Sequence, residues 1–381
     1  MTRYLLEENS IALRLGKCSD LVDKFGQIPF SETEDRGQYP ALAFAAQSLS
    51  IIEATSRLQS SAFVDRVRSA LKDPDAMRAI RLEMMVATHF SLRGHRINWP
   101  EMEGLGTFDI LIPSLGSCGL EVECKSASPD KGRKIHRREA LEFHNIISKD
   151  LTTATQGLRI GLTVILTMPG RLPTSMPELK QLASLIIHQV VLGQGVTCSD
   201  GIDIRVSSFD PQHLGISGEP PNVTINRSKL DQITQTQNRE VMVIGSRQGG
   251  VVVLVLTSKK DDTLLKSIFN TISDSANTQL TKGRPGMFMV GLNGVRPDSL
   301  VELASVDSDP GQPPTALRVA VSKFLSSTER DHVVSVNFLS DGEIFGEQES
   351  VLTSGGSAYS FPKTESPFWH PNLAGLFIPR G

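Results

Sequence analysis

The residues best suited to chemistry lie in one stretch, TFDILIPSLGSCGLEVECK, at positions 107–125. Asp109 stands in its first apolar run, and the second apolar run carries Glu121, Glu123 and Lys125 at alternate positions. Side chains alternate between the two faces of a strand, so these three charges share one face and need a partner if the strand is buried. Pairing of the two runs would bring Asp109 and Glu123 together beside Lys125. Two carboxylates and an ammonium at one point suit a hard divalent cation with a phosphate next to it.

Two strands and a helix must position these groups. The strands are predicted at 108–113 and 119–126, joined by a turn rich in Pro, Gly and Ser. A helix is predicted over about 75–92, and HRINWP at 95–100 is expected to form a further strand. Glu83 borders the apolar face of the helix, where it is either a third carboxylate of the site or a solvated surface residue.

An Asp followed by Glu-x-Lys on the next strand, here Asp109 and Glu123-Cys124-Lys125, resembles the pattern of the PD-(D/E)xK nuclease superfamily. The family often adds a glutamate on the preceding helix, and Glu83 takes that place. The pattern departs from the family at one position, because no proline precedes Asp109. The resemblance covers about a quarter of the chain. The bare spacing occurs by chance in many proteins, and the order of helix and strands around it makes it more specific.

The resemblance implies a nuclease site that uses Mg²⁺ or Mn²⁺. Asp109 and Glu123 would bind the metal through carboxylate oxygens, with the backbone carbonyl of Cys124 as a further ligand. Glu83 would complete the shell or hold a second metal through water. Lys125 would orient or deprotonate the attacking water, or neutralise the charge that develops on the phosphorane.

A basic run follows this segment and opens a helix predicted to end near Thr155. Such a run is usually a solvated helix face. Its position after the carboxylates instead favours contact with a nucleic-acid backbone. The candidate nucleic-acid-binding residues are Lys131, Arg133, Lys134, Arg137 and Arg138.

The charged strand is also compatible with three alternatives to a nuclease site. Glu121, Glu123 and Lys125 could line the exposed face of an edge strand, where charges discourage aggregation. The nuclease fold could be kept without activity, as a module that binds nucleic acid or protein. The site could belong to another metal hydrolase, although the chain has no HExxH, HxH or DxD cluster. Glu121 itself is either a supporting partner of Glu123 or a residue where the strand leaves the sheet, and we favour the second.

Composition limits the class of protein. The chain has 381 residues and a net charge of −3, so any attraction to nucleic acid must be local. Its four cysteines have no metal-binding spacing and fit a reducing compartment. No apolar signal segment opens the chain, and its longest strongly apolar run, Val251–Leu256, is too short to span a bilayer. These features predict a cytoplasmic protein without a membrane partner.

The order of elements predicts an α/β protein, and the resemblance implies a mixed central sheet flanked by helices, as in restriction endonucleases. The nuclease-like core is predicted at 76–170, including an apolar strand at 159–168, after an N-terminal helical region at 1–75. A second α/β region of unknown role follows at 171–381. The expected function is metal-dependent endonuclease cleavage of nucleic acid, with DNA favoured over RNA. Cutting of both strands would favour a homodimer.

Overall fold

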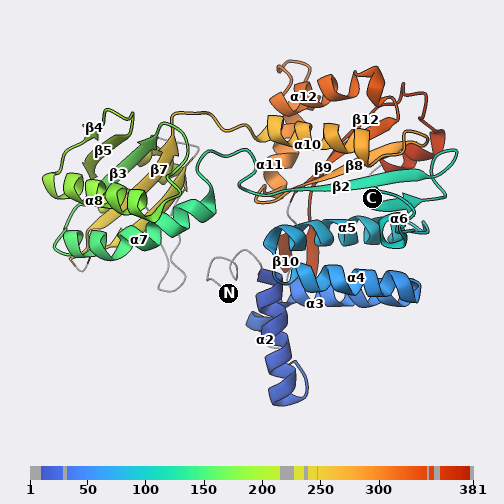
Figure 1. Ribbon diagram of the computed structural model, residues 1–381, viewed down its shortest axis with the longest axis horizontal. Coiled ribbons are helices and arrows are strands. Elements are labelled where there is room, and N and C mark those ends of the chain that lie inside the picture. The colour runs from blue at the N-terminus through green and yellow to red at the C-terminus, as the bar shows by residue number, and fades with distance from the viewer. Residues whose placement is uncertain are drawn as a thin grey trace. The chain divides into compact units, whose positions relative to one another are not determined.

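The computed structural model forms two compact units, each with its own sheet (Figure 1). Unit 1 comprises residues 1–131 and 265–381, and unit 2 comprises residues 132–264. None of the described helices is long and apolar enough to cross a membrane. The residues that the structure describes are 10–28, 32–214, 227–235, 239–246, 248–340, 343–346 and 352–377.

The sheet of unit 1 is mixed and has the strand order β1-β2-β8-β9-β12. Strands β2, β8 and β9 are parallel, and the outer strands β1 and β12 run antiparallel to their neighbours. A separate hairpin pairs β10 with β11. The bounds are β1 Ile110–Ile112, β2 Leu120–Ala127, β8 Gly286–Leu292, β9 Val333–Ser340, β10 Glu343–Gly346, β11 Leu352–Gly355 and β12 Ala358–Pro362.

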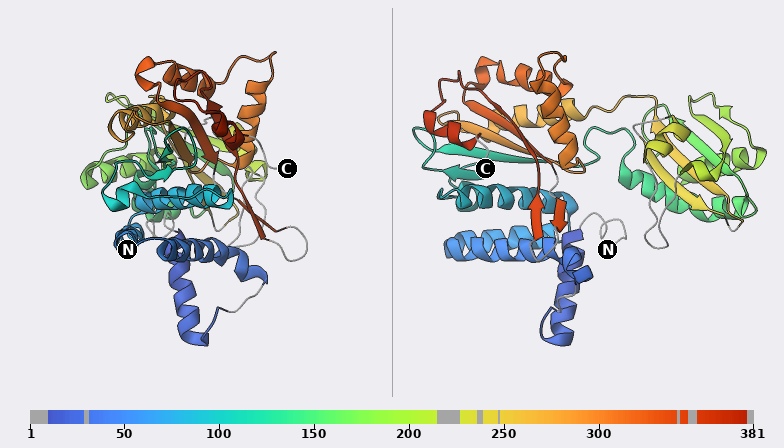
Figure 2. Two further views of the ribbon diagram at one scale, coloured as in Figure 1. Left: turned by 90° about the vertical axis from the view of Figure 1, so that its right-hand side faces the viewer. Right: turned by 180° about the vertical axis from the view of Figure 1, so that it is seen from behind.

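Helices cover both faces of this sheet, as Figures 1 and 2 show. On one face, α5 packs against β2 and α4 packs behind α5. The other face packs against α10, α11 and α12. The bounds are α2 Ser10–Phe25, α3 Glu32–Ala54, α4 Arg57–Ala70, α5 Pro74–Leu92, α6 Pro100–Glu103, α10 Leu264–Thr278, α11 Pro297–Ser308 and α12 Ala316–Leu325, with short 3₁₀ turns η2 Thr328–Arg330 and η3 Pro371–Leu376.

Helix α5 begins and packs as its sequence dictates. The Asp73 side chain accepts a hydrogen bond from the backbone N–H of Asp75 at 3.0 Å, and Pro74 occupies the first turn, where no backbone donor is needed. Because the helix lies between α4 and the sheet, apolar residues on several of its sides are buried, including Ile80 and Val86. Glu83 is buried with them.

Unit 2 is a second mixed sheet, with the strand order β4-β5-β3-β7-β6. Helices α7 and α8 pack on one face, and α9 lies with the 3₁₀ turn η1 on the other. Strands β3 and β7 are parallel and almost entirely buried. The bounds are β3 Gly161–Met168, β4 Val196–Thr197, β5 Asp203–Phe209, β6 Glu240–Gly245, β7 Val251–Ser258, α7 Arg137–Thr155, α8 Met176–Leu192, η1 Pro211–Leu214 and α9 Arg227–Thr234.

The units divide the chain differently from the predicted domains at 1–75, 76–170 and 171–381. The strand expected at 159–168 exists as β3, but it belongs to unit 2. Strand β2 pairs instead with β8, so that Glu123 lies beside Phe288. Unit 2 is therefore inserted between β2 and α10 of unit 1.

The prediction of a strand at HRINWP is wrong. In this segment only an isolated bridge joins Asn98 to Leu111, and Pro100 opens the short helix α6. Proline lacks a backbone donor for a sheet and is favoured in the first turn of a helix, which accounts for the change.

The chain enters and leaves unit 2 at neighbouring points. The backbone N–H of Thr263 donates to the carbonyl of Gly132 at 2.8 Å, and the N–H of Lys134 donates to Asp262 at 2.9 Å. We expect residues 132–264 expressed alone to fold, because such a unit loses few contacts on excision. Circular dichroism and urea denaturation should show one cooperative transition. A random-coil spectrum would contradict this prediction.

Candidate active site

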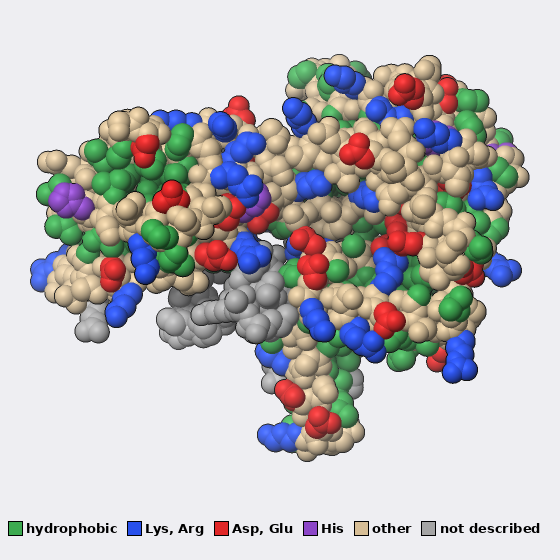
Figure 3. All heavy atoms as spheres, in the orientation of Figure 1, with side chains coloured by type: hydrophobic (Ala, Val, Ile, Leu, Met, Phe, Trp, Pro, Cys, Tyr) green, Lys and Arg blue, Asp and Glu red, His purple; other side chains and the backbone are tan. Residues whose placement is uncertain are grey.

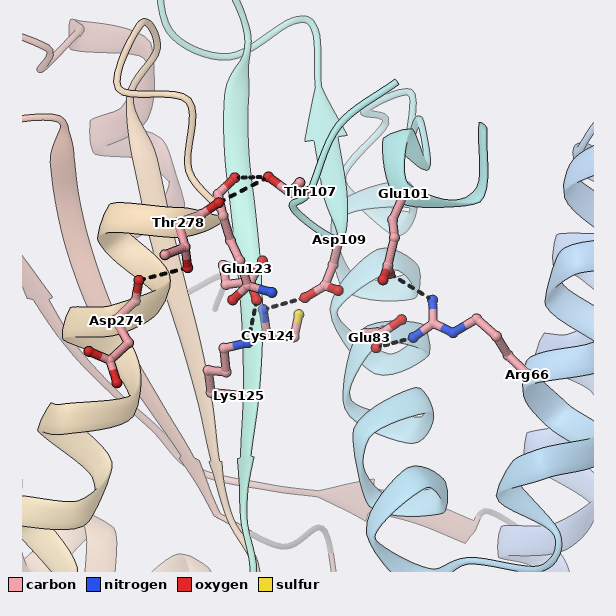
Figure 4. Close-up of polar contacts among 11 residues, drawn as sticks. Arg66, Glu83, Glu101, Thr107, Asp109, Glu123, Cys124, Lys125, Asp274 and Thr278 are labelled. Carbon is pink, nitrogen blue, oxygen red and sulfur yellow. Dashed lines mark hydrogen bonds and ion pairs between the residues drawn. The ribbon is translucent and has the colours of Figure 1, made fainter. Parts of the chain in front are cut away.

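The pairing of β1 with β2 stops at the candidate site. The last pair in register is Ile110 with Val122, and one more step would place Asp109 opposite Glu123. The Asp109 side chain instead accepts a hydrogen bond from the backbone N–H of Cys124 at 2.7 Å. The hairpin thus fixes Asp109 directly against the Glu-Cys-Lys segment, as the spacing predicted (Figure 4).

Glu123 is buried without enough partners for its charge. Its side chain is 1 % exposed, and Lys125 Nζ lies 2.6 Å from its Oε1. Neither carboxylate oxygen has a well-aligned hydrogen bond within the described residues. Burial, together with the charge of Asp109, raises the pKa of Glu123 to about 8, against the opposing effect of Lys125.

Glu121 lies two residues away on the same strand face and is in the opposite situation. It is fully buried, and its carboxylate accepts hydrogen bonds from the Thr281 backbone N–H at 2.8 Å and from the Thr281 hydroxyl. Arg284 adds an ion pair at 3.5 Å. Glu121 therefore ties β2 to the segment between α10 and β8. The edge-strand alternative is wrong, because β2 lies between β1 and β8 and both glutamates are buried.

Glu83 reaches the site from α5. Its side chain is only 5 % exposed, so it is not a solvated helix residue. Arg66 of α4 lies 2.6 Å from Glu83 Oε1 and also 3.3 Å from Glu101 of α6. Glu83 Oε2 has no hydrogen-bond partner in the described part of the chain. Burial and the charge of Asp109 raise the pKa of Glu83 to about 8.

Asp109 stands between the two glutamates (Figure 4). Glu83 lies on the α5 side, whereas Glu123 lies on the face of β2 turned towards α10. Burial raises the pKa of Asp109 to about 6, against the hydrogen bond from Cys124, and the nearby charge of Glu101 adds to the rise. Asp109 and Glu101 each repel both Glu83 and Glu123 electrostatically.

Sequence reasoning missed Arg66 and Glu101. Arg66 is one of several charged residues on an amphipathic helix, and Glu101 stands in a polar turn. Nothing in their spacing relates them to Asp109, because only the packing of α4 and α6 against α5 and β1 brings them near.

Charge and donor chemistry suit a divalent cation. Among the described residues, Glu83, Glu101, Asp109 and Glu123 lie near two cations, Arg66 and Lys125, so these six groups carry a net charge of −2 when all are ionised. Carboxylate oxygens are the ligands that Mg²⁺ and Mn²⁺ favour. Glu83 Oε2 and the two carboxylate oxygens of Glu123, which have no well-aligned hydrogen bond among the described residues, are suited to such an ion.

The carboxylates are not gathered as one ligand set. Among the described residues, no group of three or more His, Cys, Asp or Glu side chains is placed to hold a metal ion. Two observations account for this. Glu83 and Glu123 come from opposite sides of β2, and each is drawn to a cation of the protein, Arg66 or Lys125. The role of the Cys124 carbonyl as a ligand stays a prediction, and burial raises the pKa of the Cys124 thiol well above its usual range, so the thiol is no nucleophile.

The helix predicted after the basic run exists as α7 and ends at Thr155 as expected, but it belongs to unit 2, whereas the candidate site belongs to unit 1. Of the five candidates only Lys131 belongs to unit 1, where its Nζ donates to Thr271 at 2.8 Å. Arg133 pairs with Glu240 and lies 3.8 Å from Asp262, and Arg138 pairs with Glu142 at 3.3 Å. Figure 3 shows basic and acidic side chains interspersed on the visible face of unit 2. The remaining candidates are Lys134 and Arg137, and nucleic-acid contact stays a prediction for all five.

We found no match to this chain among protein-family models, curated proteins or solved structures. Its function must therefore be inferred from the residues of the site.

Proposed function

We propose that this chain is a Mg²⁺- or Mn²⁺-dependent nuclease of the PD-(D/E)xK type. It would hydrolyse phosphodiester bonds of nucleic acid, with DNA favoured over RNA. The observation that carries the proposal is the contrast between Glu121 and Glu123, which lie on the same face of β2. Glu121 is satisfied by fixed protein donors, whereas Glu123 is equally buried beside Asp109 and, among the described residues, pairs only with Lys125. A protein that needed both glutamates only for its fold would satisfy both.

The order of elements around Asp109 supports the same proposal. Helix α5 supplies Glu83, the hairpin β1–β2 supplies the Asp and the Glu-x-Lys, and α10 then leads to β8, which is parallel to β2. A helix and a parallel strand were expected after the Glu-x-Lys segment, and in unit 1 these places are taken by α10 and β8 instead of α7 and β3. Unit 2 is inserted before them.

Each side chain has a role in the proposed reaction. Asp109 and Glu123 would hold the metal, and Glu83 would complete the shell directly or through water. The metal, when bound, supplies a Lewis acid for the scissile phosphate and lowers the pKa of a bound water. Lys125 is 23 % exposed, so its ammonium can reach both Glu123 and solvent. It would orient the attacking water and offset negative charge in the transition state.

A second candidate function is a binding module that keeps the fold without activity. The observation in its favour is that Arg66 and Lys125 already engage Glu83 and Glu123, and that no three-ligand group is formed by the described side chains. Such a module would bind nucleic acid or protein with the same affinity whether or not a divalent cation is present.

Cleavage of supercoiled plasmid DNA in Mg²⁺ or Mn²⁺ tests the proposal, with RNA assayed in parallel. Lys125→Met should lower the rate by about 100-fold or more, because it removes the cation beside the attacking water. Lys323→Met is the matched control, since it removes the same charge from the exposed face of α12, and it should leave the rate unchanged. Cleavage that survives both Lys125→Met and Asp109→Ala would show that the site is misassigned.

A further inference from the structure

Arg66 is shared by two carboxylates that differ in burial. Its Nη2 lies 2.6 Å from Glu83 and its Nη1 lies 3.3 Å from Glu101. The Glu83 side chain is 5 % exposed and the Glu101 side chain is 51 % exposed. The Arg66 side chain lies between these values, at 32 %. The guanidinium thus reaches a buried carboxylate while part of it stays in contact with solvent (Figure 4).

The guanidinium competes with a metal ion for the same oxygens. Without a metal, Arg66 is the cation nearest Glu83, and it offsets the repulsion between Glu83 and Asp109. A divalent cation bound at Asp109 would attract Glu83 and repel Arg66, because like charges at such distances are unfavourable. Arg66 would then lose its inner partner. The planar fork of a guanidinium matches a phosphate as well as a carboxylate, so a phosphate group is the anion that best replaces Glu83.

We infer that Arg66 exchanges partners when the site is loaded. In the metal-free protein it pairs with Glu83 and Glu101, and in the loaded protein it binds a backbone phosphate of the nucleic-acid substrate. The inference rests on the proposed function, since it needs both the metal and the phosphodiester substrate. It assigns Arg66 to substrate binding, and it makes this contact depend on the metal.

The test measures DNA binding and metal binding separately. A short fluorescent duplex is titrated by anisotropy, with Ca²⁺ and then with EDTA, so that the readout does not depend on cleavage. Mn²⁺ binding is measured by calorimetry. The variants are Arg66→Met, which removes the charge at similar length, and Arg66→Lys, which keeps the charge but loses the fork. Arg68→Met is the matched control, because Arg68 is on the same helix and pairs only with exposed Asp65 in the described structure.

In Ca²⁺ we expect Arg66→Met to weaken DNA binding by about 10-fold, and Arg66→Lys by a smaller factor, because a charge-assisted bidentate contact is lost. In EDTA both variants should match the wild type within about twofold, as should Arg68→Met in either condition. Arg66→Met should bind Mn²⁺ at least as tightly as the wild type, because a competing cation is gone. Thermal unfolding shows whether each variant is folded. If Arg66→Met does not fold, Arg66→Lys still tests the inference.

Three results would overturn the inference. Equal loss of DNA affinity in Ca²⁺ and in EDTA would make Arg66 an ordinary surface cation. Loss of Mn²⁺ binding in Arg66→Met would make it a residue that positions Glu83. DNA binding in Ca²⁺ that is unchanged in Arg66→Met would leave Arg66 without a role in substrate binding. These three results concern the Arg66 variants. If the proposed function itself were wrong, the wild type would bind no Mn²⁺.

Discussion

Glu123→Gln should lower metal-dependent cleavage by about 100-fold or more while making the folded protein more stable at alkaline pH. The loss of activity follows because the amide gives the metal a weaker, neutral ligand. The gain in stability follows because a buried charge with too few partners is removed. The freed Lys125 is 23 % exposed and can be solvated.

The sign of the pH dependence follows from the raised pKa. Glu123 has a pKa of about 8 in the folded protein, compared with an ordinary value of 4.5. The folded protein therefore holds a proton that the unfolded chain has released, so the free energy of unfolding falls as the pH rises from about 4.5 to about 8. Glu123→Gln abolishes this fall. Its advantage should be near zero at pH 4 and reach about 1–3 kcal/mol at pH 9, as measured by urea denaturation without added metal.

Glu121→Gln is the matched control, since it makes the same substitution two residues away on the same strand face. Glu121 accepts two hydrogen bonds from Thr281 and pairs with Arg284. Its replacement should cost about 1–3 kcal/mol of stability, because an amide cannot satisfy all three groups. Cleavage per folded molecule should change by less than a few-fold. Equal effects of the two variants on both properties would contradict the distinction between Glu121 and Glu123.

The β1–β2 hairpin and helix α5 were predictable because their signals are local. The hairpin is marked by its turn and by alternating charges, and helix α5 is marked by an Asp-Pro start. Which strands pair with each other in a sheet is not set by such local signals. β3 and β8 are both short apolar strands that follow a helix, and either could pair with β2. The observed partner is β8, in which Phe288 lies beside Glu123 although it is about 165 residues further along the chain. This pairing depends on tertiary packing, and the sequence carries no cue to it.

The residues of the candidate site likewise fall into those that local signals predicted and those that only tertiary packing brings together. Asp109, Glu123 and Lys125 were predicted to converge because the strand period fixes their faces and one turn joins their strands. Arg66 and Glu101 were missed because each comes from a separate helix whose packing brings it to Glu83. The basic run shows the limit of nearness in sequence. It was expected at the site because it follows Glu123 and Lys125 in the chain, but all of its candidates except Lys131 belong to the other unit. Their contact with nucleic acid stays a prediction.

Asp109→Asn and Asp109→Ala should separate the chemical role of Asp109 from its structural one. Asparagine keeps an oxygen that can accept the hydrogen bond from the Cys124 N–H, which Asp109 accepts at 2.7 Å. Alanine leaves that half-buried donor without this partner. We therefore expect the free energy of unfolding of Asp109→Asn to lie within about 0.5 kcal/mol of the wild-type value, and that of Asp109→Ala to be lower by about 1–2 kcal/mol. Both should lose Mn²⁺ binding in calorimetry, and cleavage should fall by about 1000-fold, because both lack the carboxylate between Glu83 and Glu123.

The comparison of the two variants decides between a metal site and a structural aspartate. A structural role alone predicts that Asp109→Asn behaves like the wild type in every assay, because its hydrogen bond to β2 is intact. A metal role predicts that the two variants are equally inactive although only Asp109→Ala is destabilised. Asp109 is well suited to this test because the same carboxylate that ends the β1–β2 ladder lies among the other acidic groups. Retention of Mn²⁺ binding by Asp109→Asn would rule out Asp109 as a charged ligand.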